Sequence, residues 1–157
     1  MLFLLMHIVH ILTVILWIGG LAFVTGIVLP MVIKTPDALQ KVLTFQRIEH
    51  RFAPLAKAYN IVVGITGFIM VWQTGWYELY FTKDGWALTF MTAVWLFWFI
   101  MLVGLEPIVI RKMLDRMARE GATMDIDGIF KKVKTLHWFM VAISLAAAAA
   151  GAIAAHG

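Results

Sequence analysis

Four long apolar stretches dominate this sequence of 157 residues, at about 2 to 33, 52 to 76, 86 to 110 and 133 to 155. A helix needs roughly 20 apolar residues to cross the hydrocarbon core of a bilayer, and each stretch is longer than that. Hydrophobic residues make up 62% of the chain and charged residues 14%, whereas soluble domains average about 45 to 50% and about 25%. The sequence therefore predicts an all-α integral membrane protein, a single domain over 1 to 157 that folds as an antiparallel bundle of four transmembrane helices.

Charged residues between the apolar stretches predict the orientation of the bundle. Segment 34–57 carries five basic and two acidic residues, and segment 111–134 carries seven basic and four acidic residues. Connection 74–84 has only three charged residues and is bordered by an aromatic belt of Trp72, Trp76, Tyr77, Tyr80 and Trp86. Since basic loops stay in the cytoplasm, we expect both basic segments inside and both termini outside, in a bacterial cytoplasmic (inner) membrane. The net charge of +4 then follows from topology and membrane lipid, and no nucleic-acid partner is expected.

Polar residues at the inner ends of the helices predict further local structure. Apolar residues recur at helical spacing among basic residues over 105–119, so the third helix is expected to extend into the cytoplasm and to stop near Gly121. Asp127 is the predicted N-cap of the fourth helix. Lys57 and Glu106 fall inside apolar stretches, where an unpaired charge is costly, so we expect them to form an ion pair.

His10 is the first candidate ligand, because an ionisable side chain inside a membrane helix is a functional hypothesis by default. Trp17 follows it by almost two helical turns and lies on the same face, and Gly19 and Gly20 allow a flat ligand or another helix to approach closely. The alternative is a histidine that only hydrogen-bonds a neighbouring helix. The chain has no cysteine, which excludes thiolate ligands, disulfides and iron–sulfur clusters.

His50 and His137 form a second candidate site at the inner ends of the second and fourth helices. If those helices are diagonal in the bundle, two imidazoles at one depth can bind a haem iron from opposite faces. Arg51, beside His50, and Arg47 are candidates to hold haem propionates, although the positive-inside bias also accounts for them. Both histidines are equally consistent with ordinary interfacial residues.

His7 and His10 define an alternative metal site. They are three residues apart on one helix face, and Met6 adds a thioether that suits monovalent copper. A pair of this spacing is a weak signal, and methionines in an apolar chain are mostly packing residues.

Two stretches resemble known membrane families: the run from His10 to Gly20, which contains WIGG, and RIEHRFAPLAKAYNIVVGITGFIMV from Arg47 to Val71. They are similar to the first two helices of the related CopD and HemJ-type families, over roughly the first half of the chain. CopD proteins are associated with copper resistance, and the HemJ type comprises membrane protoporphyrinogen oxidases that bind b-type haem. The resemblance implies that His10 is an axial haem ligand. The lysine that the oxidases require after a Gly-Trp pair is absent, since ALTFMT follows Gly85 and Trp86.

These observations predict a membrane protein that carries haem b, either one per chain or two in opposite leaflets, and acts in electron transfer or haem-linked redox chemistry. The missing lysine argues against a protoporphyrinogen-oxidase-like activity, so whether the protein is an enzyme is left open. The alternatives are a copper transport or handling protein that uses Met6, His7 and His10, and a cofactor-free structural subunit of a membrane complex. The partners expected are membrane lipid and either a second copy of the chain or a redox partner protein.

Overall fold

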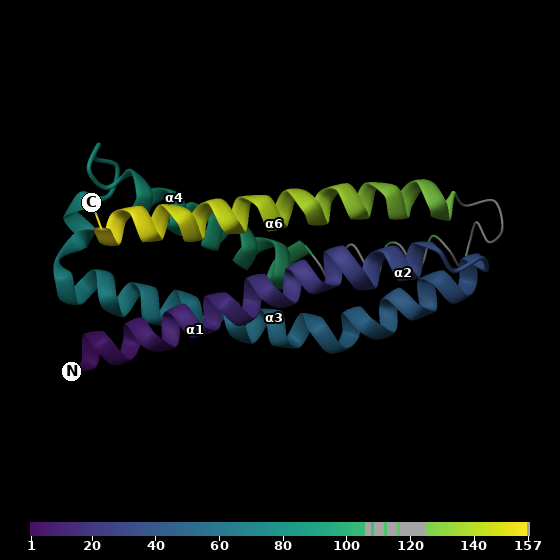
Figure 1. Ribbon diagram of the computed structural model, residues 1–157, viewed down its shortest axis with the longest axis horizontal. Coiled ribbons are helices and arrows are strands. Elements are labelled where there is room, and N and C mark those ends of the chain that lie inside the picture. Colours follow the sequence, from purple (N-terminus) through teal and green to yellow (C-terminus); the bar gives the residue numbers. More distant parts are fainter. Residues whose placement is uncertain (106–107, 109–111, 113–115, 117–124, 157) are drawn as a thin grey trace.

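The computed structural model of the protein is built from long helices (Figure 1) and describes residues 1–105, 108, 112, 116 and 125–156. The first rod comprises α1 (Leu2–Phe23), the π-helical η1 (Val24–Val28) and α2 (Leu29–Ile33). It is followed by α3 (Ala38–Thr74), the 3₁₀ turn η2 (Trp76–Leu79), α4 (Trp86–Phe99), the π-helical η3 (Ile100–Leu105) and α6 (Ile126–His156). Within the described residues, four helices are long and apolar enough to span a membrane, as predicted.

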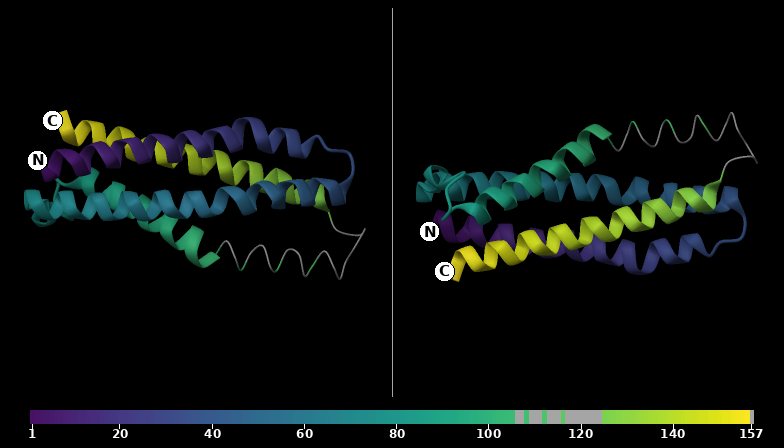
Figure 2. Two further views of the ribbon diagram at one scale, coloured as in Figure 1. Left: turned by 90° about the horizontal axis from the view of Figure 1, so that it is seen from below. Right: turned by 90° about the horizontal axis from the view of Figure 1, so that it is seen from above.

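The helices form an antiparallel ring in which α1 packs along α3, α4 packs along α6, and α1 and α3 also contact α6 and α4 respectively. The first and third spans therefore lie diagonally across the bundle, and so do the second and fourth, which confirms the predicted arrangement. Both termini lie at one end, and the turn between α2 and α3 lies at the other (Figures 1 and 2). We call the end with this turn the inner end, on the basis of its basic residues.

The second helix begins much earlier than the sequence predicted. The apolar stretch predicted a start near residue 52, within the basic segment 34–57, but the turn is short and α3 starts at Ala38. Pro36 cannot continue the preceding helix, and the side chain of Asp37 accepts a hydrogen bond from the Gln40 N–H at 2.7 Å. At the other end, Gly75 takes a left-handed conformation (φ 72°) that stops the helix. The apolar stretch marked the part of α3 inside the membrane, whereas the helix itself starts at its cap.

The start of the fourth helix also differs from the prediction. It begins at Ile126, and the capping residue is Asp125, whose carboxylate accepts the Gly128 N–H at 2.9 Å. Asp127, the predicted N-cap, lies one position inside the helix and forms an ion pair with Lys41 of α3. A capping side chain must be outside the first turn, and Asp125 occupies that place.

In the described part of the chain, three rods are longer than a bilayer core. They contain 32, 37 and 30 residues, whereas α4 with η3 contains 20. At 1.5 Å per residue, the distance along α3 from Trp72 in the aromatic belt to Arg51 is about 32 Å, close to one hydrocarbon thickness. A bilayer with its outer boundary at Trp72 would therefore have its inner boundary near Arg51, and the inner ends of three rods would extend beyond it.

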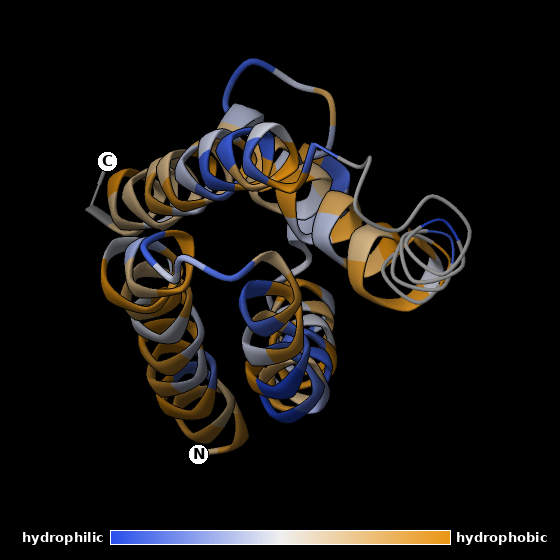
Figure 3. Cartoon of the chain, turned by 90° about the vertical axis from the view of Figure 1, so that its right-hand side faces the viewer, coloured by the Kyte–Doolittle hydropathy of each residue, from blue (hydrophilic) through white to orange (hydrophobic). Residues whose placement is uncertain are grey.

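Two separate groups of buried side chains hold the bundle together. The first lies within the membrane span and joins all four helices through Trp17, Leu21, Val63, Val94, Trp98, Met140 and Val141. The second lies at the inner end and comprises Leu29, Val32, Val42, Ile126 and Phe130. Figure 3 views the bundle from that end, where hydrophilic residues gather on α3 and α6.

Several predicted features concern residues that the structure does not describe. The proposed cytoplasmic extension over 105–119 is described only at its first residue and at three helical positions, Ile108, Lys112 and Arg116. The predicted stop at Gly121 lies outside the described residues, and so does Glu106. Lys57 is half-buried on α3, and its predicted pairing with Glu106 stays a prediction.

Candidate functional site

His10 lies inside the bundle, where it contacts α3. Its Nδ1 is 2.9 Å from Thr66 Oγ1, and its ring lies beside Gly67, where a Cβ would be 3.4 Å from Cε1. The Thr66 oxygen also lies 2.7 Å from the Val62 carbonyl and 3.2 Å from the Val63 carbonyl. If the Thr66 hydroxyl donates to its own helix, Nδ1 of His10 is the protonated nitrogen and Nε2 keeps the lone pair that a ligand needs.

His137 of α6 also has its Nδ1 in a hydrogen bond. Its Nδ1 is 2.9 Å from the Val133 carbonyl, which can only accept, so this nitrogen is protonated. Because that bond is to its own helix, Nε2 is directed away from the α6 backbone. A hydrogen bond on one ring nitrogen that orients the other is the arrangement usually found in metal-ligating histidines.

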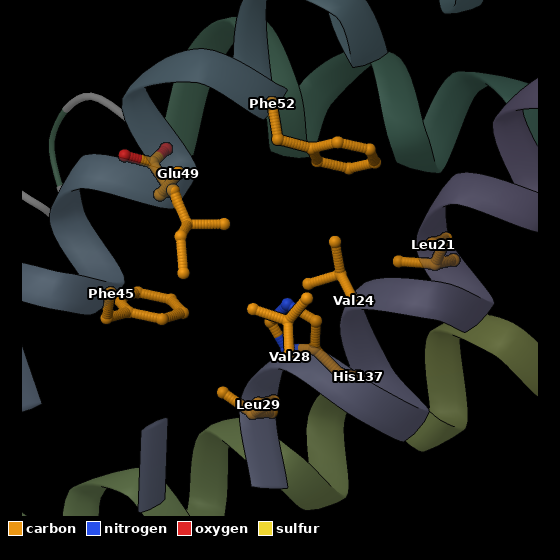
Figure 4. Close-up of a pocket in the computed structure, with 9 residues that line it drawn as sticks. Leu21, Val24, Val28, Leu29, Phe45, Glu49, Phe52 and His137 are labelled. Atoms are coloured by element: carbon orange, nitrogen blue, oxygen red, sulfur yellow. The ribbon is translucent and has the colours of Figure 1, made fainter. Parts of the chain in front are cut away.

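The His137 ring projects into a small cavity between the two buried clusters (Figure 4). The cavity has a volume of about 50 Å³ and is lined by Leu21, Val24, Val28, Leu29, Phe45, Ile48, Glu49, Phe52 and His137. Its walls are mostly apolar, and in Figure 4 the Glu49 carboxylate is turned away from the ring. A space of this size holds one or two water molecules.

His50 and Arg51 are not brought to this cavity. Both side chains are exposed on the outer face of α3, although Glu49, the preceding residue, lines the cavity. His50 and His137 are therefore at similar levels along the bundle, but the structure does not place their rings face to face.

The two buried histidines are also far apart. Leu21 is the first residue of α1 that lines the His137 cavity, and it is eleven residues from His10, or about 16 Å along the helix. One iron atom cannot bind both imidazoles in this arrangement. The bundle thus contains two separate histidine positions at different levels along its length.

Trp17 and Gly20 lie between these two levels. Trp17 is buried, and its ring meets that of Trp98 edge-on, with centroids 5.3 Å apart. The Trp98 indole N–H donates to Ser144 Oγ at 3.0 Å, which ties the pair to α6. The Phe52 ring of α3 packs closely against Gly20. A Cβ at that position would be only 3.0 Å from the ring.

The alternative copper site involves His7, near the start of α1. His7 is half-buried, and its ring is 5.8 Å from that of Phe3. Among the described residues, no group of three or more histidine, aspartate or glutamate side chains is close enough to hold a metal ion.

Two polar residues of the interior were missed by the sequence analysis. Thr66 orients His10, and Asn60 is only 1% exposed, with neither atom of its amide hydrogen-bonded to any described residue. A lone asparagine inside an apolar stretch is itself a signal, because buried polar groups in membranes tend to be functional. Thr66 gave no such signal, since threonine commonly bonds its own helix backbone.

Comparisons with models of protein families, with curated proteins and with solved structures gave no match to this chain, so its function must be argued from these residues alone.

Proposed function

We propose that this protein binds b-type haem inside its membrane bundle and acts in electron transfer or another haem-linked redox reaction. The observation that carries the proposal is the position of His10 inside the bundle, with Nδ1 held 2.9 Å from Thr66 Oγ1. An Nδ1–H donated to Thr66 would leave Nε2 as a ligand. The resemblance of the first two helices to the CopD and HemJ-type families supports the same residue. His137 offers a second ligand of the same kind in the inner half.

The imidazole nitrogens of His10 and His137 are suitable ligands for a haem iron. The cavity beside His137, however, is too small for a porphyrin in this conformation. Cofactor pockets usually enclose about 300 to 1,000 Å³, whereas the cavity beside His137 has about 50 Å³. Phe52 fills the space between Gly20 and this cavity, so its ring would have to move first. Bound haem would supply a one-electron iron couple, and the chain would supply the imidazole ligand, its orientation and an interior closed to water.

The first test compares His10→Ala with His7→Ala, a matched control one turn away on the same helix. We expect the parent protein, purified in detergent, to show a Soret band and a reduced α band. His10→Ala should lose most of its haem, whereas His7→Ala should keep it, because a methyl group cannot replace an axial ligand. The measurement is the pyridine haemochrome per chain. Equal haem in the two variants would remove His10 from the site, and a colourless parent that takes up copper would favour the copper alternative.

Three further variants, Thr66→Val, His137→Ala and His50→Ala, extend this test. Thr66→Val keeps the His10 ligand but removes the acceptor of its Nδ1–H, so it should shift the reduction potential and weaken haem retention rather than abolish it. If a second haem is bound in the inner half, His137→Ala should remove about half of the total, and His50→Ala should remove none. A parent with one haem per chain that is unchanged in His137→Ala would limit the proposal to the His10 position.

A further inference from the structure

The outer face of α3 carries three basic side chains at the inner boundary of the membrane. Arg47, His50 and Arg51 are all exposed, and their spacing of three and four residues places them on one face of the helix. The same face continues toward the membrane through Pro54 and Ala58, which are exposed as well.

Three acidic residues of α3 and α6 or their ends have other contacts in the described part of the chain. Glu49 lines the internal cavity, Asp37 caps the start of α3, and Asp127 pairs with Lys41. Two arginines four residues apart on a helix repel each other. An anion between them removes this repulsion, and an arginine fork is well suited to a phosphate because it binds two oxygens at once.

The depth of the group matches that of lipid phosphates. Arg51 lies one hydrocarbon thickness from the aromatic belt, as shown above, so the group is at the level of the headgroups. Toward the membrane the same side of α3 turns apolar, and Leu55 and Ile61 are 52% and 46% exposed. One leaflet is about 15 Å deep, which corresponds to the ten residues from Arg51 to Ile61.

An apolar groove begins where a lipid chain from this leaflet would end. It has a volume of about 440 Å³ and is lined by Ile61, Gly64, Ile65, Phe68 and Ile69 of α3 and by Trp95 and Phe99 of α4. The outer face of α3 therefore presents cations at headgroup depth, exposed apolar side chains below them, and a groove that begins near the bilayer centre.

We propose that this face binds an anionic phospholipid of the inner leaflet. Arg47, His50 and Arg51 hold its phosphate, and one acyl chain lies along Leu55, Ala58 and Ile61 up to the groove. This gives His50 and Arg51 a role that does not depend on haem.

The test uses Arg47→Gln/Arg51→Gln, with Lys131→Gln/Lys132→Gln as a control that removes the same charge from exposed positions of α6. Each protein is purified in detergent, and the binding of phosphatidylglycerol and of phosphatidylcholine is measured by native mass spectrometry. We expect the parent to prefer phosphatidylglycerol, the arginine variant to lose about tenfold in that preference, and the lysine variant to keep it. Arg47→Lys/Arg51→Lys should keep only part of it, because lysine binds phosphate as a point charge.

The remaining outcomes are decisive as well. Equal loss in the arginine and lysine variants would show a diffuse charge effect and overturn the proposal. An unchanged preference in the arginine variant would overturn it too. Excess inorganic phosphate should fail to displace the lipid, and displacement would show an anion site that does not use the acyl chain. Circular dichroism of each variant checks that the helices are intact.

Discussion

At the scale of single residues, Gly64 is where a side chain has the least room in the membrane span. A Cβ there would be 2.5 Å from the Trp95 ring, which lies across the helix, and the Trp95 indole N–H donates to the Asn60 carbonyl at 2.9 Å. This contact joins α3 to α4, two neighbours in the ring of helices.

Gly64→Ala should therefore push the Trp95 ring away and weaken its hydrogen bond to Asn60. We expect a loss of about 1 to 3 kcal/mol, as is typical when a packed site is overfilled. Gly19→Ala is the control, because no atom lies within 4 Å of a Cβ at that position. Thermal unfolding in detergent measures the loss of stability, and tryptophan fluorescence reports a change in the surroundings of the Trp95 ring. Equal stability of the two variants would show that α3 and α4 can separate at no cost.

At the scale of elements, the ion pair between Lys41 and Asp127 joins the starts of α3 and α6. Lys41 is 4% exposed, whereas the Asp127 side chain is largely exposed. The free-energy cost of losing each partner is therefore unequal, because only the lysine is desolvated.

Asp127→Asn should lower the melting temperature more than Lys41→Met does. The first change leaves a buried ammonium group without its counter-ion, whereas the second leaves a solvated carboxylate in the first turn of a helix, where it is favourable. The double variant should resemble Lys41→Met, because the two positions are coupled. Additive losses in the thermal unfolding of all three variants would contradict the pairing.

The sequence was sufficient to predict the number and order of the apolar helices. It was not sufficient to predict where each helix begins or which of its faces is turned to the interior of the bundle. Apolar stretches report the part of a helix inside the bilayer, so α3 was predicted from residue 52 although it begins at Ala38. Pro36 and Asp37 carried the missing signal. For the site, the sequence placed His10 and His137 on the first and fourth helices, but which neighbour each ring meets depends on helix rotation. The contact of His10 with Thr66 joins residues 56 positions apart, and no local pattern encodes it.

At the scale of the whole molecule, both termini lie opposite the turn between α2 and α3, so one labelling experiment fixes the orientation of every helix. The chain has no cysteine, and Lys34 and Lys83 are exposed at opposite ends. In intact bacterial cells, a membrane-impermeant maleimide should label Lys83→Cys, and it should reach Lys34→Cys only after permeabilisation, because basic loops are retained inside. The reverse pattern would invert the assignment of inner and outer ends.

The unequal lengths of the rods have a consequence for the surrounding bilayer. The first rod, Leu2–Ile33, is about 48 Å long, and Phe23, Ile27 and Met31 leave its inner part apolar and exposed. At a similar depth, α3 exposes Arg47 and α6 exposes Lys131. The mismatch between hydrophobic helix length and bilayer thickness would thus differ around the bundle. Beside α1 the bilayer would have to thicken or the rod would have to tilt, whereas beside α3 the bilayer could keep its normal thickness. Such a deformation costs free energy along one edge only, and two chains that meet along this edge share it.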